Sequence, residues 1–307
     1  MEKITSILVA SDLSEESDEV VRAAGEIARA TGATVHLLNA FDLPPEASVR
    51  KSTAPVTFAQ RIEEAEQRLD EQIRRGIPEG VSVGSRRVEV YVAHKAILDG
   101  AVAVAADLIV VGPHGRRRFG DDVLGGTADR VIRSAEVPCL VARGTLSLPL
   151  RRIVAPVDRS AAATAALEVA IGWGVLLGGG DATELDVEHI LPEAMNIPEL
   201  GIDPDRIVER LGQEVQEVVS RVPGAESLNV VTRVRWGQSA VEEITRLAGE
   251  NHADLVVIGT HGHGPLRRFL IGSVASGVAR RAPCSVLLVP PAMWRQERQR
   301  LSGADAR

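Results

Sequence analysis

The fifteen residues GTHGHGPLRRFLIGS, from Gly259 to Ser273, have the composition of a phosphate-binding loop. Glycines let backbone N–H groups come close to a ligand, and a helix N-terminus adds unpaired N–H donors with partial positive charge. A helical pattern begins at Ser273, whose hydroxyl can donate to a phosphate oxygen, and Arg267 and Arg268 can add charge-assisted hydrogen bonds. The alternative is a solvated loop in which the glycines only make a tight turn.

This loop lies in a pattern that occurs twice in the 307-residue chain. Three segments of the first half return in the same order in the second half, at offsets of 145 to 147 residues. They are SILVASDLS and RIVAPVDRS, ADLIVVGPHG and ADLVVIGTHG, and VPCLVA and APCSVLLV. A nearly constant offset indicates two copies of one domain of about 145 residues. We therefore expect domains at residues 1–146 and 147–292 and a charged tail at 293–307.

Within each copy, short apolar runs alternate with amphipathic helical patterns. In the first copy, strands are expected at 7–11, 34–41, 87–92, 107–112 and 139–142, with helices after Ser14, through 62–73, at 94–106 and at 127–135. In the second copy, strands are expected at 153–157, 185–191, 228–236, 254–259 and 285–289, with helices at 161–177, 207–219, 239–248 and 273–281. Continuous apolar strands between helices indicate parallel strands covered on both faces. Each half should therefore be an open, doubly wound α/β sheet of five parallel strands.

A carboxylate and a glycine loop should face each other in each half. Asp12 and Asp158 end the first strand of their copies, and the glycine loops start at Gly112 and Gly259 after the fourth strand. Ligands of open α/β sheets bind beyond the carboxyl ends of the strands, where the strand order reverses. If the first and fourth strands are neighbours, each half has a crevice with an aspartate on one side and a phosphate-binding loop on the other.

The spacing Gly-x2-Gly-x9-Gly-Ser after ADLVVIGTHG, an aspartate closing the first strand and a final PCSVLLV strand resemble the universal stress protein family in its tandem two-domain form. The resemblance extends from Ile7 to Pro290. It implies the strand order 3-2-1-4-5 in each half. It also implies ATP binding, with Mg²⁺ on the phosphates, wherever the loop is intact.

The resemblance assigns nucleotide-facing positions residue by residue. In the second half these are Asp158, the strand end at His189 and Ile190, and the loop residues Gly259, Gly262, Gly272 and Ser273. In the first half they are Asp12, the strand end at Asn39 and Ala40, and the loop residues Gly112, Gly115 and Gly125, followed by Gly126 and Thr127.

The first copy departs from the pattern at one loop position. Gly126 stands where the second copy has Ser273, and the nearest hydroxyl, on Thr127, comes one residue later. A hydroxyl contact is therefore lost or relocated, while the backbone donors remain. We expect the second half to be the stronger nucleotide site.

Other classes of function are disfavoured. The net charge of −7 argues against general nucleic-acid binding, which needs a concentrated basic surface. No run approaches the roughly 18 apolar residues of a membrane span, and we expect a cytoplasmic protein. Cys139 and Cys284 lie in apolar runs and are expected to be buried. His114 and His261 have no second ligand at metal spacing nearby, so we interpret both as structural and expect no metal site.

Three hypotheses follow. The first is a regulatory stress-response protein that acts by nucleotide occupancy, without catalytic residues, because no glycine is followed by the lysine of a phosphate-loop NTPase. The second is an enzyme that slowly hydrolyses ATP or transfers adenylyl groups on the same scaffold. The third is that the first half has become a dimerisation or scaffolding module. We also expect a homodimer, whereas the sequence does not indicate a protein partner.

Overall fold

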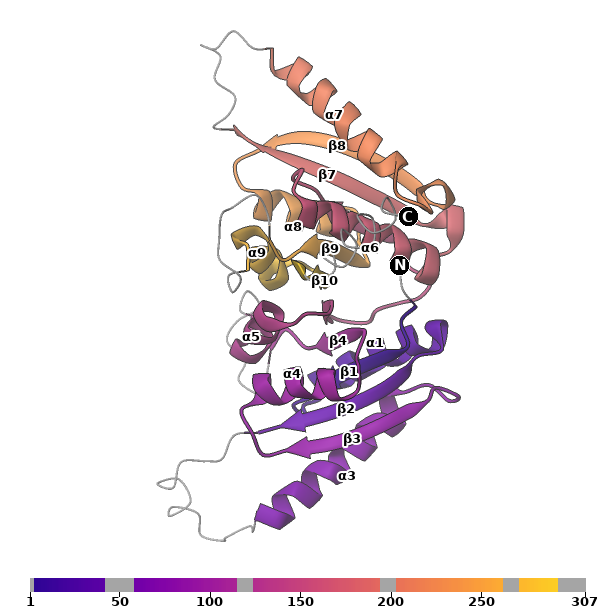
Figure 1. Ribbon diagram of the computed structural model, residues 1–307, viewed down its shortest axis with the longest axis vertical. Helices are drawn as coiled ribbons and strands as arrows, with labels where there is room; N and C mark the ends of the chain where they lie inside the picture. Colours follow the sequence, from indigo (N-terminus) through magenta and orange to yellow (C-terminus); the bar gives the residue numbers. More distant parts are fainter. Residues whose placement is uncertain (1–2, 42–57, 115–123, 194–202, 262–270, 292–307) are drawn as a thin grey trace, which may run out of the picture.

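The computed structural model describes residues 3–41, 58–114, 124–193, 203–261 and 271–291. These residues form one ten-stranded sheet (Figure 1). Its strands are β1 (Ser6–Ala10), β2 (Thr34–Ala40), β3 (Val83–Glu89), β4 (Leu108–Val111), β5 (Cys139–Val141), β6 (Arg152–Pro156), β7 (Glu184–Pro192), β8 (Asn229–Gly237), β9 (Leu255–Gly259) and β10 (Ser285–Val289). Their order is β3-β2-β1-β4-β5-β10-β9-β6-β7-β8. The order 3-2-1-4-5 expected for each half is therefore confirmed.

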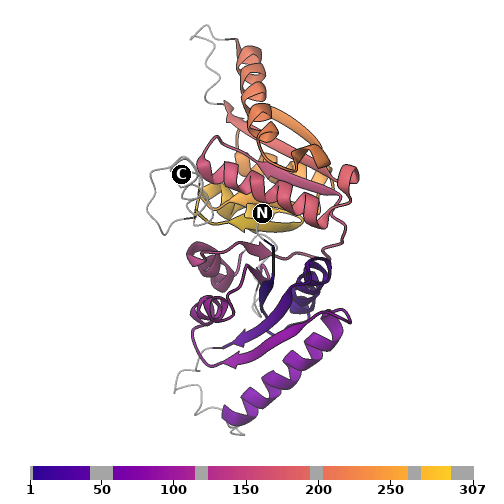
Figure 2. The same cartoon turned by 45° about the vertical axis from the view of Figure 1, so that its right-hand side comes forward.

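Helices cover both faces of this sheet. They are α1 (Glu16–Thr31), α3 (Phe58–Gly76), α4 (Ala93–Ala103), α5 (Gly126–Ser134), α6 (Ala161–Leu177), α7 (Pro204–Ser220), α8 (Ala240–Glu250) and α9 (Ser273–Arg281), with short 3₁₀ turns η1 (Gly180–Ala182) and η4 (Ala225–Ser227). Side chains of α1, α3, α6 and α7 share one apolar core, and those of α4, α5, α8 and α9 share the other. Each half is thus doubly wound, as expected (Figure 2).

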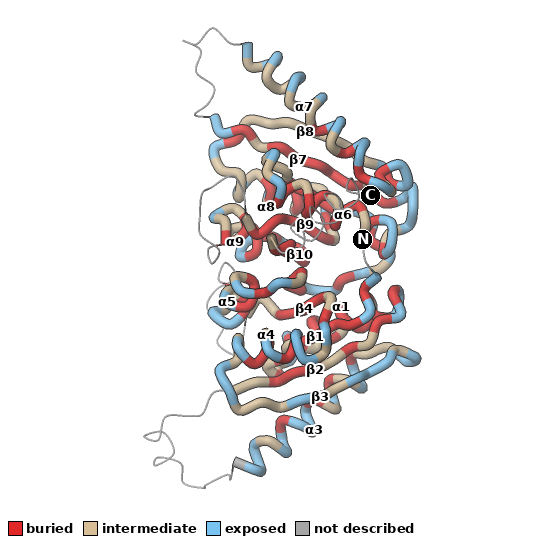
Figure 3. Tube along the Cα trace, viewed as in Figure 1, coloured by how far each residue is buried: buried red, intermediate tan, exposed pale blue. Residues whose placement is uncertain are grey.

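The strands supply both cores because successive side chains point to opposite faces. In β1, Ile7 and Val9 are buried in the core beneath α1 and α3, whereas Leu8 is buried in the core beneath α4 and α5. The central strands are therefore buried along most of their length, as Figure 3 shows. A parallel sheet buried on both faces needs such continuous apolar runs, which is why the sequence indicates these strands so clearly.

The two halves are joined by a strand pair that the sequence does not predict. β5 and β10 run antiparallel, with Cys139 opposite Leu288 and Val141 opposite Val286. We call this pair the central seam. It gives both strands a neighbour on each side, so neither half presents this edge to solvent. All other neighbouring strands of the sheet are parallel.

The register of the sheet corrects one alignment between the copies. Ile109 of β4 pairs with Cys139, and Val256 of β9, which matches Ile109 in the repeat, pairs with Val286. Cys139 therefore corresponds to Val286, and aligning it with Cys284 is wrong by two residues. Because side chains alternate with a period of two, the shift leaves the same face buried.

The third strand of the first half also differs from expectation. The sequence predicts it at 87–92, but β3 covers Val83–Glu89. The carbonyl of Val92 accepts hydrogen bonds from Lys95 and Ala96, so helix α4 starts immediately after Val92 and ends the extended run. Among the described residues, no helix has the length and apolar character needed to cross a membrane.

Candidate functional site

The sheet brings the expected site elements of each half to neighbouring strand ends. β1 pairs with β4, with Ile7 opposite Leu108, and β6 pairs with β9, with Ile153 opposite Leu255. The carboxyl ends of parallel neighbours lie at the same edge of a sheet. Each aspartate turn after the first strand therefore adjoins the start of the glycine loop in its own half, and the end of strand two lies on the other side.

Both aspartates belong to tight turns between strand one and the following helix. The Asp12 carboxylate accepts hydrogen bonds from the Ser14 N–H at 3.0 Å, from the Ser14 hydroxyl at 2.6 Å and from the Ser17 hydroxyl. The Asp158 carboxylate accepts the N–H of Ser160 at 3.0 Å. Ala163 occupies the place of Ser17 in the second half. The Asp12 carboxylate therefore accepts a hydrogen bond from the Ser17 hydroxyl that Ala163 cannot donate in the second half.

The residue after each aspartate has the same unusual backbone. Leu13 and Arg159 both have φ of 65°. Side chains with a Cβ occupy this left-handed region at a cost of roughly 1–2 kcal/mol. Such conformations persist where the surroundings determine them, and they cluster at functional sites. The turn is thus a specific feature of both copies rather than an accident of one loop.

A side chain of strand two is hydrogen-bonded to the residue that follows strand one in both halves. In the first half, Asn39 Nδ2 donates to the Ser11 carbonyl at 2.8 Å. In the second half, His189 Nδ1 lies 2.7 Å from the Val157 carbonyl, which can only accept, so this nitrogen donates. Both acceptors directly precede the aspartate of strand one. The Oδ1 atom of the buried Asn39 side chain has no hydrogen-bond partner among the described residues, which leaves an acceptor beside this strand end.

The two ends of each glycine loop meet through one backbone hydrogen bond. Gly125 N–H donates to the Pro113 carbonyl, and Gly272 N–H donates to the Thr260 carbonyl, both at 2.7 Å. The next residue in each case begins helix α5 or α9. Because both N-caps are glycines, no side chain of these residues occupies the first N–H groups of either helix. Gly115 and Gly262 lie outside the described residues.

Two glycines of these loops have different structural roles. A Cβ atom at Gly259 would lie 2.8 Å from the Ala162 carbonyl oxygen, so this glycine lets β9 pass close to α6. A Cβ atom at Gly126 would have no heavy atom of the described residues within 4 Å. A serine like Ser273 would fit there, so steric hindrance does not explain why the first half has no hydroxyl at this position.

The loop histidine of the second half lies against the residue after β9, and both cysteines are buried. His261 Nδ1 lies 2.9 Å from the hydroxyl of the buried Thr260, which also donates to Val289 O at 3.3 Å. No group of three or more His, Cys, Asp or Glu side chains in the described ranges could hold a metal ion. Burial raises the pKa of both thiols, Cys139 and Cys284, to about 12. The expected burial of the cysteines is thus confirmed.

A charged cluster on strands two and three of the second half was not among the sites predicted from the sequence. Asp186 and Glu188 of β7 are buried and pair with Arg233 of β8, and Glu188 also pairs with Arg235 at 3.2 Å. Burial raises the pKa of Glu188, and Arg235 and Arg233 partly oppose this shift. Alternating charges in LDVEHIL and TRVRW were the available signal.

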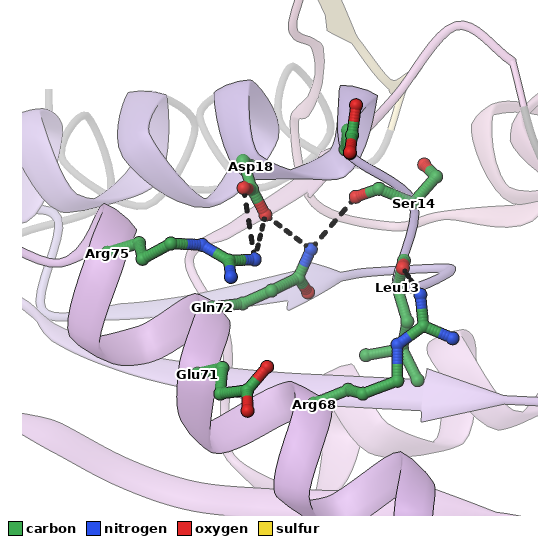
Figure 4. A pocket seen from close by; sticks show the side chains of 8 residues that line it. Leu13, Ser14, Asp18, Arg68, Glu71, Gln72 and Arg75 are labelled. Carbon is green, nitrogen blue, oxygen red and sulfur yellow. Dashed lines mark hydrogen bonds and ion pairs between the residues drawn. The ribbon is translucent and has the colours of Figure 1, made fainter.

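A polar cavity of about 520 Å³ lies behind the aspartate turn of the first half (Figure 4). Gln72 of α3 reaches into it and donates to the Ser14 carbonyl at 3.1 Å and to Asp18 at 2.8 Å. Its Oε1 accepts the Ser11 hydroxyl at 2.5 Å. Arg68 donates to the Leu13 carbonyl, so α3 holds the turn that carries the first-half aspartate. The lining residues are Leu13, Ser14, Glu15, Asp18, Arg68, Glu71, Gln72 and Arg75.

Comparison with known families gives two matches to the same model. The universal stress protein family model matches residues 3–143 and again residues 149–290. A universal stress protein of Mycolicibacterium smegmatis is 26% identical over 311 residues, which cover 93% of this chain and 97% of that protein.

Solved structures show the same tandem architecture. A universal stress protein from Archaeoglobus fulgidus superposes with a TM-score of 0.62 at 19% identity, covering 93% of this chain and 96% of that one. A putative universal stress protein from Pseudomonas aeruginosa superposes with a TM-score of 0.62 at 20% identity and covers 98% of both chains. At these identities, the similarity of the structures shows the fold alone.

Proposed function

Because the chain belongs to the universal stress protein family, we propose that it binds ATP, with Mg²⁺ on the phosphates, and acts in the stress response by nucleotide occupancy. The observation that carries this proposal is the hydrogen bond that joins the two ends of the glycine loop in the second half. The hydrogen bond from Gly272 to Thr260 sets the N-terminus of α9 at the end of β9, the strand beside β6, and Asp158 lies in the turn that follows β6. A helix N-terminus at such a strand edge suits a phosphate.

In this proposal each element of the second half has one role. The N–H groups of Gly272, Ser273 and the preceding loop, including Gly262, bind phosphate oxygens, and the Ser273 hydroxyl adds a donor. Asp158 binds a hydroxyl of the ribose from the neighbouring turn. The backbone of β7 at Ile190 lies against the adenine, supported by the hydrogen bond from His189 to Val157, the residue after β6. Gly259 contributes chiefly by letting the strand pass α6.

We propose that the first half is the weaker nucleotide site. Its candidates are Asp12, Ala40, Gly112, Gly115, Gly125, Gly126 and Thr127. Gly126 has no hydroxyl, and the Asp12 carboxylate already accepts bonds from Ser14 and Ser17. Both differences reduce what this half can offer a nucleotide. A stoichiometry near one ATP per chain would also fit a scaffolding role for the first half.

Calorimetric titration of the full chain with ATP and Mg²⁺ tests this function. We expect binding that Asp158→Ala weakens strongly and that Asp12→Ala, the matched change in the other half, affects less. If the wild-type chain takes up no ATP, the proposal is wrong. If the two variants lose affinity equally, the ranking of the halves is wrong.

A turnover assay addresses the alternative of slow hydrolysis or adenylyl transfer. We expect phosphate and AMP release at background level even when ATP saturates the chain. Release that depends on Asp158 would favour an enzyme. The homodimer is likewise a proposal, and sedimentation with and without ATP would test both the assembly and its dependence on the nucleotide.

A further inference from the structure

An arginine of the first half contacts the far end of the helix that opens the second-half site. Arg143 follows β5, and its Nη2 donates to the carbonyls of Ala279 and Arg280 at 2.8 and 2.7 Å. These carbonyls belong to the last turn of α9, where the helix itself supplies no N–H partner. A cation at this end also complements the negative pole of the helix dipole. Arg143 therefore caps α9 from across the central seam.

Further contacts make this junction specific. The Arg143 N–H donates to the Ser285 hydroxyl at 3.1 Å, which fixes the residue to the start of β10. The side chain of Arg280 pairs with Asp129 of α5 at 3.6 Å. Asp129 also pairs with Arg133 of its own helix at 2.7 Å. The two loop-bearing helices, α5 and α9, are thus joined side by side across the seam (Figure 1).

The described residues show no counterpart of this cap in the other direction. The register of β4–β5 and β9–β10 places the two copies at an offset of 147 residues in this region, so Pro290 stands where the first half has Arg143. A proline has no cation and no side-chain donor. The second half therefore cannot cap α5 from this position. The support runs from the first half to the second.

We propose that Arg143 is a positioning residue for the second-half nucleotide site. Helix α9 has only nine residues, so its C-terminal anchor sets the direction in which its N-terminal N–H groups point. With the anchor in place, these groups are fixed before the ligand arrives, and binding does not have to order them. The inference rests on the function proposed above. It makes nucleotide binding in the second half depend on the first half, even when the first half is empty.

The test measures ATP binding to each half separately. Hydrogen exchange is followed by mass spectrometry during an ATP–Mg²⁺ titration, and protection of residues 273–281 reports the second site while protection of 126–134 reports the first. In Arg143→Ala we expect roughly fivefold to tenfold weaker binding at the second site and an unchanged first site. Arg143→Lys, which keeps the charge, should recover part of the loss. If Arg143→Ala instead lowered the stability of the whole chain, ATP binding would weaken at both sites, and Arg143→Lys would not restore the second site alone.

Arg281→Ala is the matched control. Arg281 is an exposed arginine at the same end of α9 for which the described residues show no bonding partner, so its removal should leave both sites unchanged. If Arg143→Ala does not fold, Arg143→Gln replaces it, and the expected order of affinity is Arg, Lys, Gln. Wild-type binding with no difference between Arg143→Ala and Arg281→Ala overturns the inference and leaves the proposed function standing. Absence of ATP binding in the wild type would instead remove the proposed function itself.

Discussion

His189 holds the carbonyl of Val157 with a 2.7 Å hydrogen bond from its Nδ1 atom. The bond joins strand two to the residue directly before Asp158, and Asn39 makes the equivalent contact to Ser11 in the other half. Two different side chains thus perform one task at the same place. The bond also requires the imidazole proton on Nδ1 whenever the ring is neutral.

We expect His189→Ala to destabilise the chain by about 1–2 kcal/mol, because the Val157 carbonyl loses a buried donor. His189→Asn, which copies the first half, should restore most of that loss. Chemical denaturation of the three proteins measures the free energies of unfolding. Equal losses in the Ala and Asn variants would show that the imidazole acts through packing alone.

The hydrogen bond between Ser11 and Gln72 should behave as a coupled pair. At an offset of 146 residues the second half has Val157 and Val218, which pack on the same core. We expect Ser11→Val and Gln72→Val each to cost about 1–3 kcal/mol, since each leaves a buried polar partner behind. The double variant should cost less than the sum by roughly 1 kcal/mol. Additive losses in a double-mutant cycle would contradict the coupling.

The left-handed backbone at Arg159 predicts an unusual preference for glycine. Arg159→Gly should be more stable than Arg159→Ala by about 1 kcal/mol, because both lose the guanidinium but only alanine keeps a Cβ at positive φ. Arg210 is the matched control, since it also pairs with Glu214 but lies within α7. There glycine should be the less stable by about 1 kcal/mol. The same order at both positions would argue against strain at Arg159.

Both cysteines should be unreactive in the folded chain. With the thiol pKa raised to about 12 at Cys139 and Cys284, the thiolate at pH 8 is about one part in ten thousand. We expect a thiol reagent such as dithionitrobenzoate to label neither residue under native conditions and both after denaturation. Rapid labelling of the native protein would show that one of these strands opens readily.

Glu188 should make stability fall as the pH rises. Its pKa is raised by burial above the ordinary 4.5, so between these two values the folded chain binds a proton that the unfolded chain has lost. The contribution is fully present below pH 4.5 and is lost as the pH rises through the higher, folded value. The stability of wild type relative to Glu188→Gln should therefore decrease from pH 4.5 upwards, measured by denaturation at each pH. The exposed Glu217→Gln is the control, and an equal slope in both comparisons would contradict the assignment.

The sequence predicts the strands and the glycine loops because their signals are local. Continuous apolar runs identify β6, β9 and β10, and Gly272 with Ser273 marks the start of a helix. The end of the third strand is not given by the local pattern, because the valines of RVEVYV favour a strand. In the structure, the Val92 carbonyl instead accepts the first hydrogen bonds of α4.

Contacts between the halves were not predictable from these signals. Leu140 and Leu287 pair across the seam, but each reads only as one apolar residue in a strand. Likewise, Arg143 lies in what looks like a polar linker, and nothing in the local pattern points to α9, 136 residues away. The left-handed turn at Leu13 and Arg159 is hidden for another reason, since neither residue type favours that backbone.

Because the central seam lies within one chain, its pairing does not depend on the protein concentration. Two separate half-chains that met through these strands would form a complex whose stability depends on their concentration. Here one polypeptide carries both strands, so the local concentration of each partner is fixed by the short linker between β5 and β6, which joins the two halves. The pairing is unimolecular, and the cap on α9 is available to every molecule however scarce the protein is in the cell.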